Sequence, residues 1–112
     1  MPRYESGDIV YCRNVPYRDK TGFKTRPVLI ISNKYLDYVN EFIYIEITEN
    51  KPIYGLGLYL RDEWLSHPIR LKSYLKFYGI GTLLKSHIDR KISELKPECF
   101  EKIKNKLEKI LM

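Results

Sequence analysis

The clearest strand signal in the sequence is the stretch FIYIEIT, residues 42–48. Its three isoleucines alternate with Tyr44, Glu46 and Thr48, so an extended chain places the isoleucines on one face and the other three residues opposite them. This alternation is typical of an antiparallel sheet with one face on the core and one face in water. We therefore expect residues 42–48 to form a strand whose polar face is exposed.

Two more predicted strands precede this stretch. Residues 7–12 form the first, and a long loop rich in proline, glycine and charge follows it, from Arg13 to Thr25. The run Val28-Leu29-Ile30-Ile31 is continuously apolar, which predicts a central strand buried on both faces.

Two predicted strands follow the stretch. Leucines alternate over residues 56–60, and residues 73–78 place Leu75 and Phe77 on the inner face. We expect a tight turn at Gly79-Ile80-Gly81, because two glycines weaken a strand and leave backbone exposed to a ligand.

The apolar period changes from that of a strand to that of a helix after Pro97, a residue suited to the first helical position. One helical stripe then carries Phe100, Ile103, Leu107 and Ile110. Residues 91–95 are ambiguous, since they could close the sheet or begin this helix. Short strands followed by one terminal helix predict an α+β fold. We expect a single domain over residues 1–112, a small antiparallel β-barrel with a C-terminal amphipathic helix at about 97–111.

Composition favours a polyanionic partner. The 112-residue chain carries a formal charge of +6 and ten tyrosines, and phosphates with unstacked bases suit such a surface. The alternative is that the lysines only keep the protein soluble. No apolar stretch approaches the ~18 residues that a membrane helix needs, and the charged N-terminus does not resemble a signal peptide, so we expect a cytoplasmic protein with no membrane contact.

Metal-binding patterns are missing from the sequence. Cys12 and Cys99 lie far apart, and His67 and His87 stand alone, so we expect neither a metal site nor a cofactor. The cysteines are expected to be small buried residues, with a disulfide as the alternative for a hyperthermophilic source.

Residues 7–11 lead through a charged loop to Thr25-Arg26-Pro27-Val28-Leu29, and this opening resembles that of the MazF/PemK family of toxin ribonucleases. Tyr44 to Thr48, Ser73 and the segment 79–83 are similar in order and spacing to later blocks of that family, so the likeness spans about Gly7 to Leu111. The resemblance implies an SH3-like barrel, a homodimer, and metal-independent cleavage of single-stranded RNA under the control of an acidic antitoxin peptide.

The resemblance also implies site residues. Its catalytic positions match Arg26, Thr48 and Ser73. A guanidinium can hold two phosphate oxygens at once, and a hydroxyl can donate to a third. We expect RNA contacts from the first loop and from the strand at 73–78, namely from Arg18, Lys20, Lys24, Lys76 and Tyr78. The simpler alternatives are solvated charges, a surface arginine at a strand start, and a threonine and a serine that only border strands.

This chain departs from the family pattern where the family carries Gln, Arg and sometimes Asp. Those places hold Tyr78, Gly79, Gly81 and Leu84. The catalytic base is therefore unassigned, and a weak or inactive RNA- or protein-binding module on the same barrel is an alternative. A gyrase-directed toxin is a second alternative, which Arg26-Pro27 and the missing C-terminal tryptophan disfavour.

Overall fold

The computed structural model describes residues 3–16, 21–69 and 72–111. Its six strands form one antiparallel sheet in the order β4-β5-β3-β2-β1-β6. The strands are β1 Asp8–Pro16, β2 Phe23–Ile30, β3 Glu41–Thr48, β4 Gly57–Tyr59, β5 Tyr74–Leu84 and β6 Ile88–Glu94. The helix is α1 Pro97–Leu111, and three 3-10 turns are η1 Lys34–Val39, η2 Asp62–Trp64 and η3 Lys85–His87. The predicted α+β class and the position of the helix are confirmed.

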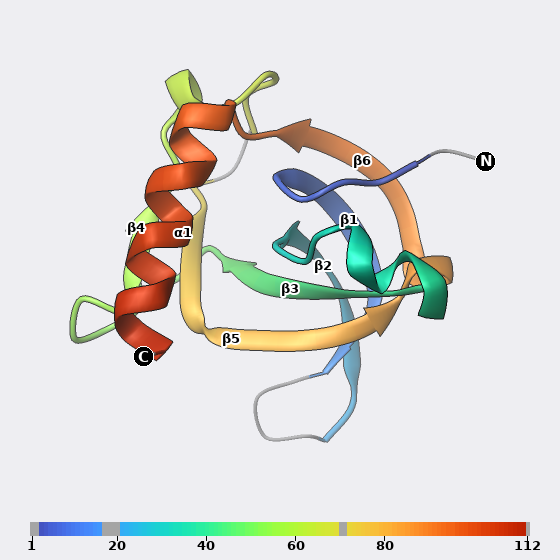
Figure 1. The fold of residues 1–112 in the computed structure, drawn as a ribbon. Coiled ribbons are helices and arrows are strands. Elements are labelled where there is room, and N and C mark those ends of the chain that lie inside the picture. The colour runs from blue at the N-terminus through green and yellow to red at the C-terminus, as the bar shows by residue number, and fades with distance from the viewer. Residues whose placement is uncertain (1–2, 17–20, 70–71, 112) are drawn as a thin grey trace.

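The sheet curls on itself, as Figure 1 shows, and its two edge strands are β4 and β6. Two contacts bring the segment after β4 to the end of β6. Leu65 forms an antiparallel bridge with Leu95, and the backbone N–H of Ser66 donates to the carbonyl of Glu94 at 2.9 Å. The result is a barrel that is not strictly closed.

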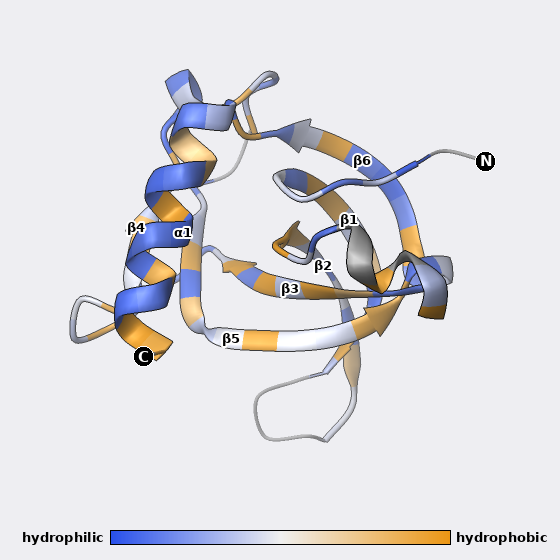
Figure 2. Cartoon of the chain, viewed as in Figure 1, coloured by the Kyte–Doolittle hydropathy of each residue, from blue (hydrophilic) through white to orange (hydrophobic). Residues whose placement is uncertain are grey.

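Two apolar clusters pack against opposite faces of the central strands. On one face, Ile45 and Leu75 pack with Ile103 and Leu107 of α1, so the stripe predicted for the helix is confirmed. Each such fully buried aliphatic side chain contributes about 1.5–3 kcal/mol. Figure 2 shows the apolar stripe of α1 facing the sheet. The second cluster lies on the other face and consists of Val10, Cys12, Val15, Val28, Ile30, Phe42, Tyr44 and Ile88.

The exposed polar face predicted for β3 is wrong. Tyr44 is 5% exposed and Glu46 is 8% exposed, so this strand is buried on both faces. The reason is the curl of the sheet, because β1 and β2 enclose Tyr44 in the second cluster. Alternation between isoleucine and polar residues therefore marked two buried faces, not one buried and one wet face. The burial on both faces predicted for the run Val28-Leu29-Ile30-Ile31 is confirmed for its first three residues, while Ile31 lies beyond the end of β2 and is only partly buried.

The tight turn predicted at residues 79–81 is also wrong, because β5 continues through them to Leu84. Ile45 of β3 pairs with Ile80, but the next residue, Glu46, pairs with Lys76, so residues 77–79 form a bulge in β5. A Cβ on Gly81 would lie 2.5 Å from the hydroxyl oxygen of Tyr44. The glycines thus allow a close approach of β3 side chains rather than a turn.

Two remaining boundaries differ from the sequence expectation. β1 continues past residue 12 to Pro16, with an irregular register after Cys12, and β2 begins at Phe23, so the predicted loop is shorter than expected. The ambiguous residues 91–95 largely belong to strand β6, which pairs with β1. Within the described part of the chain, no helix is long and apolar enough to cross a membrane.

Candidate active site

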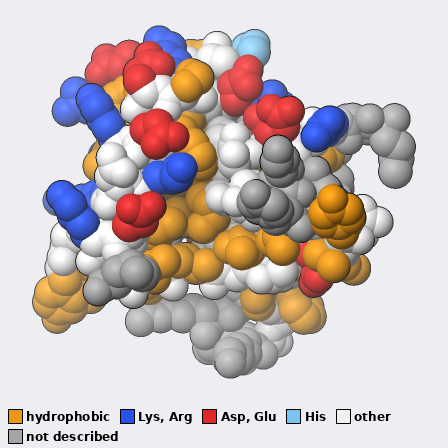
Figure 3. Space-filling view, in the orientation of Figure 1, with side chains coloured by type: hydrophobic (Ala, Val, Ile, Leu, Met, Phe, Trp, Pro, Cys, Tyr) orange, Lys and Arg blue, Asp and Glu red, His pale blue; other side chains and the backbone are white. Residues whose placement is uncertain are grey.

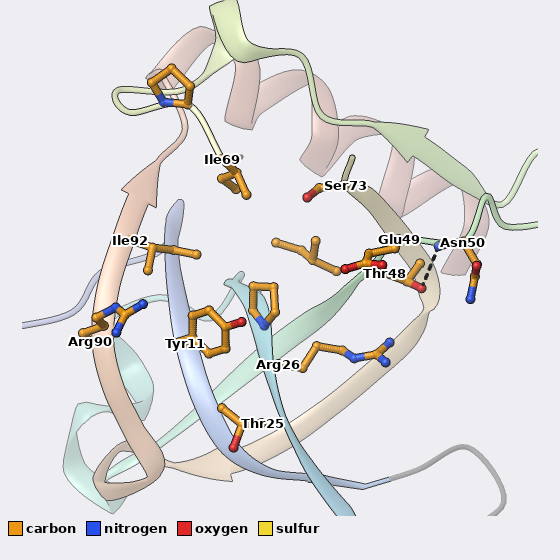
Figure 4. Close-up of a pocket in the computed structure, with 13 residues that line it drawn as sticks. Tyr11, Thr25, Arg26, Thr48, Glu49, Asn50, Ile69, Ser73, Arg90 and Ile92 are labelled. Atoms are coloured by element: carbon orange, nitrogen blue, oxygen red, sulfur yellow. Dashed lines mark hydrogen bonds between the residues drawn. The ribbon is translucent and has the colours of Figure 1, made fainter. Parts of the chain in front are cut away.

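The three residues predicted to be catalytic lie around one cavity of about 530 Å³. Arg26 comes from β2, Thr48 is the last residue of β3, and Ser73 directly precedes β5. Figure 4 shows all three in the lining, with Arg26 extending toward Thr48 and with Arg90 and Tyr11 across from it. A volume in the range of about 300–1,000 Å³ is typical of small-molecule sites, so this cavity has room for a nucleotide unit.

Thr48 has a defined hydrogen-bond arrangement. Its side-chain oxygen accepts a hydrogen bond from the backbone N–H of Asn50 at 3.2 Å, which Figure 4 marks with a dashed line. Because that oxygen is already an acceptor for the backbone, the hydroxyl proton points elsewhere and can be donated to a ligand. The geometry therefore fits a neutral hydrogen-bond donor at the rim of the cavity.

A second cavity, of about 330 Å³, adjoins the first and shares Arg26, Thr48 and Asn50 with it. Three of the predicted RNA-binding residues, Lys24, Lys76 and Tyr78, line this second cavity. The ammonium of Lys76 lies 5.0 Å from the centre of the Tyr78 ring, a cation–π contact. The other two predicted RNA-binding residues, Arg18 and Lys20, lie outside the described residues.

Positive charge gathers at this second cavity. Lys51 also lines it, so four cations and one carboxylate face the space: Lys24, Arg26, Lys51, Lys76 and Glu46. The surface over α1 is different, because acidic and basic side chains alternate there, as Figure 3 shows. Lys104 and Glu101 of that helix form an ion pair at 3.6 Å. An anionic ligand is therefore attracted to the cavities more than to the helix.

Glu46 is a site residue that the sequence did not single out. Its Oε1 lies 2.8 Å from Nη1 of Arg26 and 3.0 Å from Nζ of Lys24. The side chain of Glu46 is 10% exposed and that of Arg26 is 31% exposed. A buried carboxylate is stable only with such partners. Together with burial, this carboxylate raises the pKa of the neighbouring Tyr44 hydroxyl. The available signal was a glutamate placed between two isoleucines of a strand.

Arg90 is the second residue that sequence reasoning missed. It lines the first cavity, and its guanidinium carbon lies 5.3 Å from the centre of the Tyr11 ring. Residue 90 precedes the stretch of ambiguous secondary structure, so no sequence pattern could place its side chain. The cavity thus has an arginine on each of two opposite walls, as Figure 4 shows.

The cysteines and histidines do not join this site. Cys12 is fully buried and Cys99 is partly exposed, and both are free thiols. Burial raises the pKa of the Cys12 thiol to about 11, with a further contribution from Asp89. Neither His67 nor His87 lines the two cavities. Among the residues that the structure describes, no group of three or more His, Cys, Asp or Glu side chains is arranged to hold a metal ion.

Several solved structures share this fold. An endoribonuclease from Mycobacterial species, solved in complex with its cognate antitoxin, aligns over 97% of this chain and 95% of its own, with a TM-score of 0.73 and 19% identity. MazF from Deinococcus radiodurans aligns over 99% of this chain and 98% of its own, with a TM-score of 0.75 and 15% identity. The Mycobacterium tuberculosis toxin MazF-mt6 aligns over 85% of each chain, with a TM-score of 0.63 and 17% identity.

At these identities the likeness establishes the fold. No curated protein matches the chain. The sequence model of the PemK-like, MazF-like toxins of type II toxin-antitoxin systems matches residues 5–111, nearly the whole chain. The resemblance found in the opening strand and in Arg26-Pro27 agrees with this match. The chain therefore belongs to the family of PemK-like, MazF-like toxins of type II toxin-antitoxin systems.

Proposed function

We propose that this protein is an endoribonuclease toxin that cuts single-stranded RNA without a metal ion. The observation that carries the proposal is the convergence of Arg26, Thr48 and Ser73 on one cavity, although they come from distant parts of the chain. The endoribonuclease activity of the mycobacterial structures that share its fold supports the same conclusion. Family membership supplies the toxin role.

In the proposed reaction the 2′-hydroxyl of the RNA attacks the adjacent phosphorus and expels the 5′-oxygen of the next nucleotide. The products are a 2′,3′-cyclic phosphate and a 5′-hydroxyl. Negative charge develops on the phosphate oxygens during the attack, and Arg26 stabilises it as a fixed charged donor. Thr48 donates its hydroxyl proton to a phosphate oxygen as a neutral donor, and Ser73 contacts the substrate from the other end of the cavity.

We assign the RNA-binding role to the cations and the aromatic ring of the second cavity. Lys24 and Lys76 contact phosphates, and Tyr78 offers its ring to a base beside the Lys76 ammonium. The two cavities share Arg26. An RNA strand that occupies both cavities must therefore pass Arg26, where we propose that cleavage occurs. RNA contacts from Arg18 and Lys20, which lie outside the described residues, remain part of the proposal.

The proposed partners are a second copy of the chain and an acidic antitoxin peptide. The mycobacterial endoribonuclease is solved with its cognate antitoxin, and MazF from Deinococcus radiodurans is solved with MazE. A net charge of +6 favours an acidic peptide that folds on binding. Light scattering at high micromolar concentration tests the homodimer, and a purely monomeric mass contradicts it.

The decisive experiment incubates the purified protein with a long RNA in EDTA and maps the new ends. Cleavage in EDTA that yields 2′,3′-cyclic phosphate and 5′-hydroxyl ends supports the proposal. Intact RNA in EDTA together with cleavage on adding magnesium contradicts the metal-independent mechanism. If the protein binds RNA but does not cleave it under any condition, it is an inactive RNA-binding module on the same barrel.

A further inference from the structure

We propose that Glu46 is the general base that removes the proton from the attacking 2′-hydroxyl. This inference rests on the ribonuclease function proposed above and assigns the catalytic base that the family resemblance left open. Among the described residues that line the second cavity, Glu46 is the one carboxylate, and it shares that lining with Arg26 and Thr48. The carboxylate is thus placed beside the two residues assigned to the phosphate.

The contacts of Glu46 hold its carboxylate in one orientation at the cavity. The ion pairs with Arg26 and Lys24 both use Oε1, at 2.8 and 3.0 Å. The two cations fix the orientation of the carboxylate. In the proposal, Oε2, which makes neither of these two ion pairs, accepts the proton of the incoming hydroxyl. A general base must come within hydrogen-bond reach of the proton that it removes, and a carboxylate beside the phosphate-binding arginine meets this condition.

The backbone explains why a glutamate is tolerated here. The bulge of β5 lies between the partners of Ile45 and Glu46, and bulges re-aim the side chains next to them. A Cβ on Gly79 would lie 3.2 Å from the Cβ of Glu46 and 3.2 Å from Cδ of Lys76. The absence of a side chain at Gly79 therefore gives Glu46 the room to lie beside the cavity.

The proton of the 2′-hydroxyl passes to Oε2 of Glu46 while the 2′-oxygen forms its bond to phosphorus. The bond from phosphorus to the 5′-oxygen breaks, and that oxygen takes a proton from water. Arg26 contacts both Glu46 and the phosphate, so one side chain aligns the base with the group that is attacked. Glu46 then returns its proton to solvent before the next turnover.

The test compares pH–rate profiles for a long RNA between pH 6 and 9. Because Glu46 rather than hydroxide removes the proton in the proposal, we expect the wild-type rate to be flat over this range. Glu46→Gln keeps the shape of the side chain but removes the base, and general bases contribute about 100- to 10,000-fold. We expect a rate lower by that factor. The residual rate should rise about tenfold per pH unit, because hydroxide must then remove the proton. If Glu46 has only a structural role, the pH–rate profile of Glu46→Gln should stay as flat as that of the wild type, even where the rate is lower.

Two further variants serve as controls. Glu63→Gln makes the same chemical change at an exposed residue of η2 and should match the wild type in rate and slope. Glu49→Gln tests the exposed carboxylate that lines the first cavity, and it should keep the flat profile. Thermal unfolding verifies that each variant is folded at the assay temperature.

Three results overturn the assignment while leaving the ribonuclease function intact. The first is a Glu46→Gln enzyme with a flat profile and a rate near the wild-type value. The second is a pH–rate slope that changes in Glu49→Gln and stays flat in Glu46→Gln. The third needs no variant: a wild-type rate that rises tenfold per pH unit through neutrality shows that no ionised carboxylate acts as base. A wild-type protein that leaves RNA intact contradicts the proposed function itself.

Discussion

Replacing Arg26 by alanine separates the chemistry of the site from the stability of the fold. The guanidinium contacts Glu46 at 2.8 Å, and its side chain is 31% exposed, so its other donors can reach a phosphate. Loss of one preorganised donor to a developing oxyanion costs about 100- to 1,000-fold in rate. We expect Arg26→Ala to lose cleavage by this factor or more, because the lost donor is charged.

The effect on stability should be much smaller. Breaking a buried ion pair costs about 3–5 kcal/mol, but Arg26 is partly exposed and Lys24 still lies 3.0 Å from Glu46 in its absence. We therefore expect a loss of about 1–2 kcal/mol in the free energy of unfolding. For a chain of this size that lowers the melting temperature by about 4–8 °C.

Single-turnover cleavage of a fluorescent RNA, well below both melting temperatures, measures the first effect, and a thermal melt measures the second. Arg26→Lys is the matched control, since it keeps the charge and loses the planar fork, and its rate should fall between those of the wild type and Arg26→Ala. Cleavage by Arg26→Ala at the wild-type rate refutes the catalytic assignment. If Arg26→Ala does not fold, the expectation that Lys24 alone stabilises the buried Glu46 carboxylate is refuted.

Three other outcomes follow from the same structure. Thr48→Ala should lower the rate about 10- to 100-fold, less than Arg26→Ala because the donor is neutral, and Thr48→Ser should restore most of it in the same cleavage assay. RNA binding should weaken with salt with a log–log slope of about −2 to −3.5, as expected for roughly three to five phosphate contacts on a single strand, and a flat titration contradicts the RNA path. Iodoacetamide at pH 8 should modify Cys99 but not Cys12, whose pKa is raised to about 11 by burial, and mass spectrometry of the folded protein reveals the reverse pattern if this is wrong.

The sequence predicted the fold well wherever the spacing of apolar residues within one element shows which face of that element is buried. Leu75 and Phe77 alternate on the inner face of β5, and the stripe at Ile103 and Leu107 covers the same cluster. Both signals are local. The predicted strand boundaries were wrong where one residue type is common in two kinds of structure. A glycine such as Gly79 occurs both in turns and where two strands approach closely.

The site shows the same division. Arg26, Thr48 and Ser73 could be assigned because they match family positions, and the structure brings them to one cavity. Their catalytic roles remain predictions. Glu46 and Arg90 could not be assigned, because each depends on a partner in another strand. Glu46 contacts two residues of β2, and Arg90 contacts Tyr11 of β1, and no pattern within one strand reveals such pairs.

The close approach of β3 to β5 has a consequence for the natural history of this site. Tyr44 lies opposite Gly81 in the ladder, and a Cβ on Gly81 would lie 2.7 Å from the ring carbon Cζ of Tyr44. A lineage cannot regain a bulky side chain at position 81 without first replacing the tyrosine by something smaller. Positions 44 and 81 should therefore change together among descendants of one ancestor, and the order of the changes is constrained: the residue on β3 must shrink before the residue on β5 can grow.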